Sequence, residues 1–272
     1  MKSTADAVLE VTGLSKKFGA FTAVNDVDIR LSPGEIFGFL GPNGAGKTTT
    51  IKMLAGLLQP DQGQIKIMAN DLSRHPNLCK DHTGYIPDRP FIYEKLTGNE
   101  YLYFIASLYN REESTALKKN SQRYLELFDL LEWQDHLIES YSHGMRQKLI
   151  MTSILMLDQP LVIVDEPMVG LDPKSARIVK ELFKSKAQEG GTIFLSTHSL
   201  EIAEELCDRI AILVHGTIQA SGTLEDLHQE THTTGTNLEN IFLQLTGAHE
   251  LQDVVKALKD HTTKQQSNTP KR

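Results

Sequence analysis

The sequence of 272 residues predicts an α/β fold with a mainly parallel sheet core, an N-terminal antiparallel β portion and a helical insertion subdomain. Two observations predict it. Short apolar runs of strand length alternate with amphipathic stretches of helix length, as in parallel sheets that helices cover. The middle of the chain, in contrast, has a helical pattern. Hydrophobic residues at 40% and charged residues at 23% are ordinary for a folded chain of this length.

The strands are predicted from apolar or alternating runs, several of them bounded by turn residues. They cover residues 8–11, 27–31, 36–40, 64–68, 161–164, 192–196 and 210–214. The helices expected outside the middle of the chain cover residues 48–57, 174–188 and 200–206. Each of these helices follows an expected strand, which favours crossover connections in a parallel sheet.

The middle of the chain, between about residues 96 and 137, is helical. Tyr101, Phe104, Ile105 and Leu108 fall at i, i+3, i+4 and i+7, on one face of a helix. We expect a helical subdomain over about 89–158, inserted into a domain that covers 1–230. A polar linker at 231–236, two short amphipathic helices and a frayed tail are expected to make up 231–272.

Charge and composition exclude some functions. The net charge of −7 lacks the basic field of a general nucleic-acid binder, so no nucleic-acid partner is expected. Cys79 and Cys207 form neither a metal-like cluster nor a disulfide framework. No apolar run approaches the ~20 residues of a membrane helix, so we expect any membrane role to come through a partner.

The clearest chemical motif is a glycine-rich loop between an expected buried strand and an expected helix. It matches the phosphate-binding pattern G-x-x-x-x-G-K-[ST]. Its glycines let backbone N–H groups turn toward phosphate oxygens, and the helix adds the positive end of its dipole. Lys47 supplies a charge for the β- and γ-phosphates and Thr48 a Mg²⁺ ligand. The motif predicts a P-loop NTPase whose nucleotide-binding residues are Gly41, Pro42, Asn43, Gly44, Ala45, Gly46, Lys47, Thr48 and Thr49.

A second site is predicted where the apolar run at 161–164 ends in Asp165 and Glu166. Strand ends of this kind meet at the ligand-binding edge of α/β sheets. Asp165 can hold Mg²⁺ through its water shell, and Glu166 can polarise an attacking water. The alternative is a solvated strand end before Pro167.

His198 ends a further strand, and a lone histidine is more often structural than catalytic.

Taken in chain order, the motifs resemble those of the ATP-binding cassette (ABC) family. The resemblance covers roughly residues 8–227. The segment Tyr141 to Gln147 resembles the L-S-G-G-Q signature, Gly170-Leu171-Asp172 the D-loop and Ser196-Thr197-His198 the switch-histidine loop. Lys17-Phe18-Gly19 stands where the family has an adenine-stacking aromatic residue, and Tyr85-Ile86-Pro87-Asp88 where it has the Q-loop.

The resemblance implies a role for each of these residues. Phe18 stacks on adenine, Lys47 and its loop hold the phosphates, and Asp165 assists Mg²⁺. Glu166 acts as the general base, and His198 contacts the γ-phosphate. The resemblance therefore implies ATP as the nucleotide and Mg²⁺ as its metal.

The resemblance also implies a dimer. The signature residues are Ser142, His143, Gly144 and Met145. Ser142 and Gly144 would clamp the γ-phosphate of a nucleotide held by a second copy of the chain or by a homologous cassette. Asp172, in the D-loop, would link the two sites. In such proteins ATP closes a head-to-tail dimer and hydrolysis reopens it.

Three departures from the family pattern affect these expectations. Asp88 replaces the Q-loop glutamine, so it keeps an acceptor oxygen but loses the amide donor. It is a candidate Mg²⁺ ligand through water, or alternatively a plain turn aspartate. In the signature, Tyr141 replaces the leucine, His143 the first glycine and Met145 the glutamine, but the two phosphate-contacting positions survive. Phe18 replaces a tyrosine and keeps its π face.

The favoured function is the ATPase subunit of a membrane transporter at the cytoplasmic face of the cell membrane, with a separate integral membrane permease as partner. Phe91, Ile92 and Tyr93 are candidate permease contacts, and packing within the insertion is the alternative. The run at 237–247 resembles the tail of single-cassette exporter subunits, which favours export over import. The runner-up is a soluble cassette ATPase in translation or DNA repair. A single cassette without a long coiled coil disfavours it, and the signature disfavours a kinase or GTPase.

Overall fold

A six-stranded sheet forms the centre of the computed structural model, which describes residues 7–89, 91–111, 114–230 and 237–247. In spatial order its strands are β10 (Thr217–Gly222), β9 (Arg209–Val214), β3 (Ile36–Leu40), β8 (Thr192–Ser196), β7 (Leu161–Asp165) and β6 (Thr83–Ile86). The strands from β9 to β6 are parallel, and β10 joins β9 as an antiparallel edge. The predicted mainly parallel sheet is therefore confirmed.

A four-stranded antiparallel sheet lies beside it and confirms the expected N-terminal β portion. Its strands are β2 (Phe21–Leu31), β1 (Leu9–Phe18), β4 (Gln62–Ile67) and β5 (Asn70–Asp71). Strands β1 and β2 form a hairpin in which Phe18 lies opposite Phe21.

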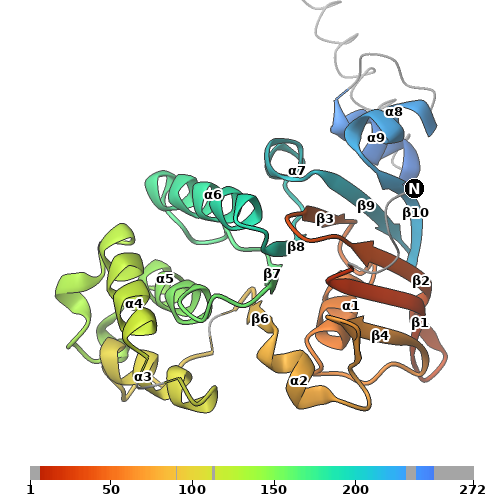
Figure 1. The fold of residues 1–272 in the computed structure, drawn as a ribbon. Coiled ribbons are helices and arrows are strands. Elements are labelled where there is room, and N and C mark those ends of the chain that lie inside the picture. The colour runs from red at the N-terminus through yellow and green to blue at the C-terminus, as the bar shows by residue number, and fades with distance from the viewer. Residues whose placement is uncertain (1–6, 90, 112–113, 231–236, 248–272) are drawn as a thin grey trace, which may run out of the picture.

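Helices surround the two sheets. They are α1 (Lys47–Leu54), α2 (Pro76–Asp81), α3 (Gly98–Leu108), α4 (Thr115–Leu127), α5 (His143–Leu155), α6 (Pro173–Gln188), α7 (Leu200–Leu206), α8 (Leu224–Glu230) and α9 (Leu238–Leu245). Short 3₁₀ turns cover Leu131–Trp133 and Ile138–Ser140. Figure 1 shows α3, α4 and α5 together to one side of the sheets, and α8 and α9 at the other end beside β10.

Alternating side chains divide the core into layers on the two faces of the parallel sheet. Val162 and Val164 of β7 share a core with Phe183 of α6. Ile163, which points the other way, shares a core with Ile51 of α1 and the antiparallel sheet. Helix α1 is therefore packed between the two sheets. Full burial of a side chain of this size stabilises a fold by about 1.5–3 kcal/mol.

Several predicted boundaries were wrong. Strand β1 continues to Phe18 instead of ending at Val11, because register shifts in its pairing with β2 and β4 interrupt the apolar alternation. Helix α1 ends at Leu54, where Gly56 takes a left-handed conformation. The patterns missed β5, β6, β10, α2 and α8. Helix α9 lies where the first tail helix was expected, whereas the linker at 231–236 and the second tail helix lie outside the described residues.

Helix α9 packs against the main body of the chain. Its Leu238 and Ile241 share a core with Ile210 and Ile212 of β9. The backbone N–H of Leu238 donates a hydrogen bond to Glu204 of α7 at 2.5 Å. In the described part of the chain no helix has the length and apolar content to cross a bilayer.

Candidate functional site

The glycine-rich loop lies between β3 and α1, at the carboxyl end of β3. The nine predicted nucleotide-binding residues all lie in this loop or in the first turn of α1. Gly46 caps α1 in a left-handed conformation (φ 110°), and a Cβ there would lie 2.3 Å from the carbonyl oxygen of Ala23. A Cβ at Gly41 would lie 2.3 Å from the carbonyl oxygen of Leu213. The loop passes so close to β2 and β9 that only glycine fits at these two positions.

Lys47 is the first residue of α1 and is buried. Its amine donates hydrogen bonds to the carbonyl oxygens of Gly41 (2.5 Å) and Pro42 (3.2 Å), so it folds back over the loop. Burial lowers the pKa of Lys47, while the carboxylates of Glu166 and Asp165 act in the opposite direction. The amine is thus desolvated and directed toward the space that the loop encloses.

A hollow of about 240 Å³ opens above this loop. Besides loop residues, its lining includes Phe21, whose side chain is 61% exposed. Sequence reasoning missed Phe21; its position three residues after Phe18, across a Gly-Ala turn, was the available signal. Phe18 is also exposed, and the amine of Lys16 lies 5.8 Å from its ring centroid. The hairpin therefore presents two exposed aromatic rings, of which Phe21 borders the hollow at the loop.

Asp165 ends β7 and is buried next to Ser196 of β8 in the parallel register. Burial raises the pKa of Asp165, and the nearby carboxylates of Asp88 and Glu166 raise it further. Burial also raises the pKa of Tyr85 to about 12, and the negative charges of Asp165 and Asp88 act in the same direction. Asp88, which is half-buried, therefore lies close enough to influence the acidic strand end.

Glu166 follows β7 in a left-handed conformation (φ 49°), which is uncommon for a residue with a side chain. Its N–H donates to the carbonyl oxygen of Ser196 at 3.0 Å, which fixes it to β8. Its carboxylate lies 2.9 Å from Nδ1 of His198 and accepts a hydrogen bond from Thr197 at 3.4 Å. The structure thus brings together Glu166 and His198, which the sequence proposed separately. Backbone conformations of this kind cluster at functional sites.

The signature residues begin α5. The hydroxyl of Ser142 caps the helix by accepting from the N–H of Met145 at 3.3 Å, and His143 and Gly144 form its first turn. Asp172 caps α6 by accepting from Ser175. The amine of Lys148 in α5 lies 3.2 Å from the Asp172 carboxylate, so the starts of the two helices lie close together.

The signature faces a different space from the phosphate loop within one chain. A hollow of about 530 Å³ is lined by Asp88, Arg89, His143, Arg146 and Val169. It shares no lining residue with the hollow at the phosphate loop. Of the predicted signature residues, His143 borders this hollow, and none borders the hollow at the phosphate loop.

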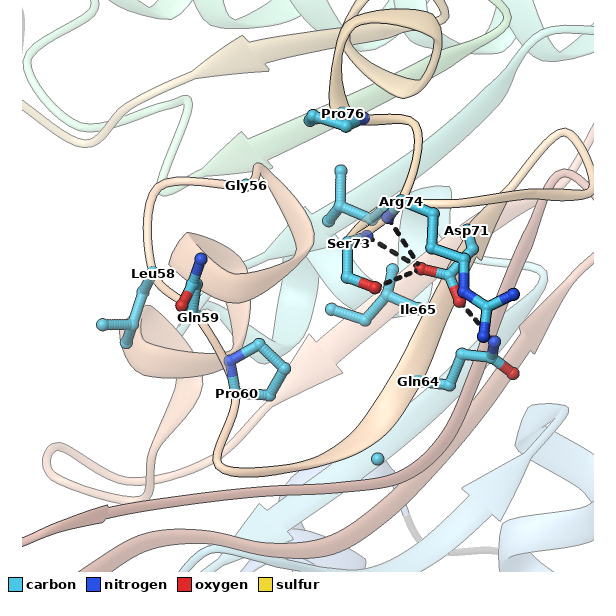
Figure 2. Close-up of a pocket in the computed structure, with 12 residues that line it drawn as sticks. Gly56, Leu58, Gln59, Pro60, Gln64, Ile65, Asp71, Ser73, Arg74 and Pro76 are labelled. Atoms are coloured by element: carbon cyan, nitrogen blue, oxygen red, sulfur yellow. Dashed lines mark hydrogen bonds between the residues drawn. The ribbon is translucent and has the colours of Figure 1, made fainter.

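A third hollow, of about 460 Å³, lies between the end of α1 and the segment β4–β5–α2 (Figure 2). Three of its polar side chains are engaged with one another. Asp71 accepts hydrogen bonds from Gln64 (2.5 Å) and from Ser73 (2.6 and 2.8 Å). Its lining residues all lie outside the phosphate loop and the acidic strand end, so we assign it no part in the site.

The donor set suits a magnesium-bound nucleoside triphosphate. Thr48 offers a hydroxyl and Asp165 a carboxylate, and Mg²⁺ prefers such hard oxygen ligands with phosphates and water completing its shell. The described residues contain no group of three or more His, Cys, Asp or Glu that could hold a metal alone. The backbone cradle and the buried Lys47 amine fit a chain of phosphates.

The model of the family described as "ABC transporter" matches residues 24–169, which span the phosphate loop, the signature and the acidic strand end. The chain belongs to the ABC transporter family. Its relatives include DrrA of Streptomyces peucetius, a daunorubicin/doxorubicin resistance ATP-binding protein. DrrA is 34% identical over 227 residues, which are 84% of this chain and 68% of DrrA.

Other members of the ABC family match over similar lengths. The ABC-type transporter ATP-binding protein EcsA of Bacillus subtilis (strain 168) is 31% identical over 88% of this chain and 97% of its own length. The probable multidrug ABC transporter ATP-binding protein YbhF of Escherichia coli (strain K12) is 35% identical over 88% of this chain. The chain spans only 42% of YbhF.

Solved structures of ABC subunits show the same fold. The structure of an ATP-binding subunit of an ABC transporter superposes with a TM-score of 0.85 at 35% identity, over 88% of this chain and 99% of that one. A dimeric ATP-binding cassette in a post-hydrolysis state, bound to ADP and Pi, has a TM-score of 0.72 at 21% identity, over 79% of this chain and 98% of that one.

Proposed function

We propose that this ABC family member is the ATP-hydrolysing subunit of an exporter, and that it couples closure of a head-to-tail dimer to a separate membrane permease. The observation that carries the proposal is the meeting of four groups at one edge of the parallel sheet. The phosphate loop follows β3, Asp165 ends β7 with Glu166 next to it, and His198 follows β8. Strands β3, β8 and β7 are direct neighbours in the sheet, so the groups that follow them face a common space.

Hydrolysis is assigned to Glu166. Its carboxylate takes a proton from a water, the water oxygen bonds to the γ-phosphorus, and the bond from that phosphorus to the bridging oxygen breaks to give ADP and phosphate. The contact with His198 holds the carboxylate in place. Lys47 and the loop amides neutralise charge on the β- and γ-phosphates. Bound Mg²⁺, held by Thr48 and through water by Asp165, would add further charge neutralisation, with Asp88 as a further ligand candidate.

The dimer places Ser142 and Gly144 of one copy on the γ-phosphate held by the other. The separate hollows at the signature and at the phosphate loop support this arrangement. Asp172 is assigned the link between the two sites, and Phe18 the stacking on adenine. A homologous cassette could take the place of the second copy in this dimer.

The surface that binds the permease is assigned to an exposed aromatic cluster after β6. Phe91 is 86% exposed and Tyr93 54% exposed, and the two rings lie 6.5 Å apart. Tyr93 stands edge-on to Phe104 of α3 at 5.4 Å, which anchors the cluster to the insertion. Ile92 instead packs against the core, so it is removed from the candidate contacts. Exposed aromatic side chains of this kind are typical anchors of protein interfaces.

Export is supported by the names of the relatives, which include drug-resistance and multidrug transporter ATP-binding proteins. None of the relatives described here is named as a translation or repair protein, so the soluble alternative gains no support. Association with a permease would place the chain at the cytoplasmic face of the membrane.

The proposal is tested with the full chain co-expressed with its candidate permease, a neighbouring gene product with about six membrane helices. The chain is expected to hydrolyse ATP and to co-purify with the permease. Phe91→Ser with Tyr93→Ser should weaken that association and leave ATP affinity unchanged. Leu108→Ser, which removes an exposed apolar side chain at the end of α3, is the matched control. Loss of ATP affinity in the double variant would contradict the assignment of these two residues, and absent ATPase activity would contradict the proposal.

A further inference from the structure

The imidazole of His143 lies directly over Gly170. A Cβ at Gly170 would stand 2.7 Å from Cδ2 and 3.0 Å from Nε2 of His143, well inside van der Waals contact. Gly170 also has a left-handed backbone (φ 79°). The ring therefore occupies the space that a side chain at Gly170 would need, and it rests on bare backbone.

Two further contacts connect the same end of α5 to the same segment. A Cβ at Gly144 would lie 3.0 Å from the carbonyl oxygen of Gly170, so the helix start approaches this backbone closely. One turn along α5, the amine of Lys148 lies 3.2 Å from the Asp172 carboxylate. The first two turns of α5 thus approach the segment that contains Gly170 and Asp172 at three points.

The turn at 166–172 connects the catalytic carboxylate to the start of α6. Its backbone is closed by hydrogen bonds from Val169 to Glu166 and from Leu171 to Met168, both of 3.3 Å. These bonds are long, so contacts from outside the turn matter for its rigidity. The Glu166 N–H is held to β8, so a shift of the turn would act on the Glu166 backbone conformation and on the direction of its carboxylate.

We propose that His143 is a positioning residue: its ring packs on Gly170 and holds the 166–172 turn against α5, so that Glu166 stays in the geometry needed for hydrolysis. The inference rests on the proposed function, because it assigns the base role to Glu166. A flat ring has few rotatable bonds and covers the backbone with many dispersion contacts. Small displacements of a reacting group have large effects on rate, up to about 10²-fold for 1 Å.

The open space beside the ring makes the proposal testable without unfolding the protein. His143 is exposed and borders the hollow that it shares with Asp88, Arg89, Arg146 and Val169. Removing the ring therefore creates no buried cavity, and a slightly larger ring can be accommodated. Two variants separate packing from the chemistry of the nitrogens. His143→Gly removes the ring, and His143→Phe keeps a flat ring without nitrogens.

The experiment uses the full chain and measures hydrogen exchange of the amides at 166–172, ATP affinity, kcat and KM. In His143→Gly we expect faster exchange in this turn and a kcat at least about tenfold lower, with ATP affinity within about twofold of the wild type. His143→Phe should restore exchange and keep kcat within about threefold. His136→Gly, which removes another exposed imidazole from the insertion, is the control and should leave all four quantities unchanged.

Unchanged exchange in His143→Gly would overturn the inference, as would His143→Phe behaving like His143→Gly, since the nitrogens and not the packing would then matter. A loss of ATP affinity in His143→Gly would also overturn it. If the wild-type chain binds ATP without hydrolysing it, the proposed function fails instead. The exchange measurement then still decides whether His143 holds the turn.

Discussion

The Nδ1 atom of His198 lies 2.9 Å from the Glu166 carboxylate, although the two residues follow different strands. The contact exists because β7 and β8 are adjacent and parallel, so their carboxyl ends meet. Most of the His198 side chain is exposed, whereas Glu166 is largely covered. A side-chain contact of this exposure adds little stability, so its value lies in orienting the carboxylate.

Glu166→Gln should abolish turnover while it preserves ATP binding, because the amide keeps the shape of the side chain but cannot accept the proton. The expected loss of steady-state ATPase activity is about 10²–10⁴-fold. The trapped nucleotide should also favour a dimer on size-exclusion chromatography. Glu201→Gln, an exposed position on α7, is the control. Near-normal activity in Glu166→Gln would remove this residue from the mechanism.

Lys47→Ala should weaken ATP binding by about 10- to 100-fold, since a hydrogen bond to a charged group contributes about 1.5–3 kcal/mol. The fold should survive, because the Lys47 amine bonds to carbonyls of the loop itself. ATP titration measures the affinity, and circular dichroism checks the fold. Lys52→Ala, on the exposed side of the same helix, should bind normally. Unfolding of Lys47→Ala would show that the residue is structural.

Phe21→Ala should weaken ATP binding by about fivefold or more, as expected for loss of one base–aromatic stack of about 1–3 kcal/mol. Inorganic tripolyphosphate has no base, so its affinity should not change. Phe18→Ala should give the same pattern if the ring stacks on adenine as the family resemblance implies. Equal losses for ATP and tripolyphosphate would mean that the substitution disturbs the loop instead of the base contact.

Asp88→Asn should reduce the dependence of ATP affinity on Mg²⁺. A carboxylate about 6 Å from both the metal and the γ-phosphate feels opposing terms of about 3 kcal/mol each at an effective dielectric near 20. With the metal bound the two terms largely cancel, whereas without it only the repulsion remains and the carboxylate disfavours ATP. The measurement is ATP affinity in Mg²⁺ and in EDTA for both chains. An unchanged ratio would mean that Asp88 only shapes its turn.

Asp165→Asn should stabilise the nucleotide-free chain at neutral pH. Burial raises the pKa of Asp165 above its unfolded value, so the folded state binds a proton more tightly and loses stability as the pH rises through that interval. Above the raised pKa the charged, buried carboxylate destabilises the fold, and the neutral amide does not. Thermal unfolding in EDTA should give a higher midpoint for the variant at pH 7 and a smaller difference near pH 4. A lower midpoint at pH 7 would show that the amide loses contacts worth more than the relieved charge.

Local chemistry explains what the sequence predicted. Close backbone approaches dictate Gly41 and Gly46 of the phosphate loop. Strand β8 is buried throughout, with an apolar centre, because both faces of the sheet are covered, so its bounds were predicted correctly. The edge strand β10 was missed because an edge needs little apolar character. Phe21 was missed because its place depends on the hairpin register. The contact between His143 and Gly170 depends on how α5 packs, which no local pattern encodes.

The position of β3 at the centre of the sheet affects synthesis of the protein. Ile36 lies opposite Ile193, and Phe37 opposite Arg209, so the strand that leads into the phosphate loop has its partners far along the chain. At about 5–20 residues per second, a ribosome needs on the order of ten seconds to supply them. During that interval the apolar β3 segment is exposed without its neighbouring strands. The nascent chain therefore depends on chaperones or early packing by α1 to avoid aggregation.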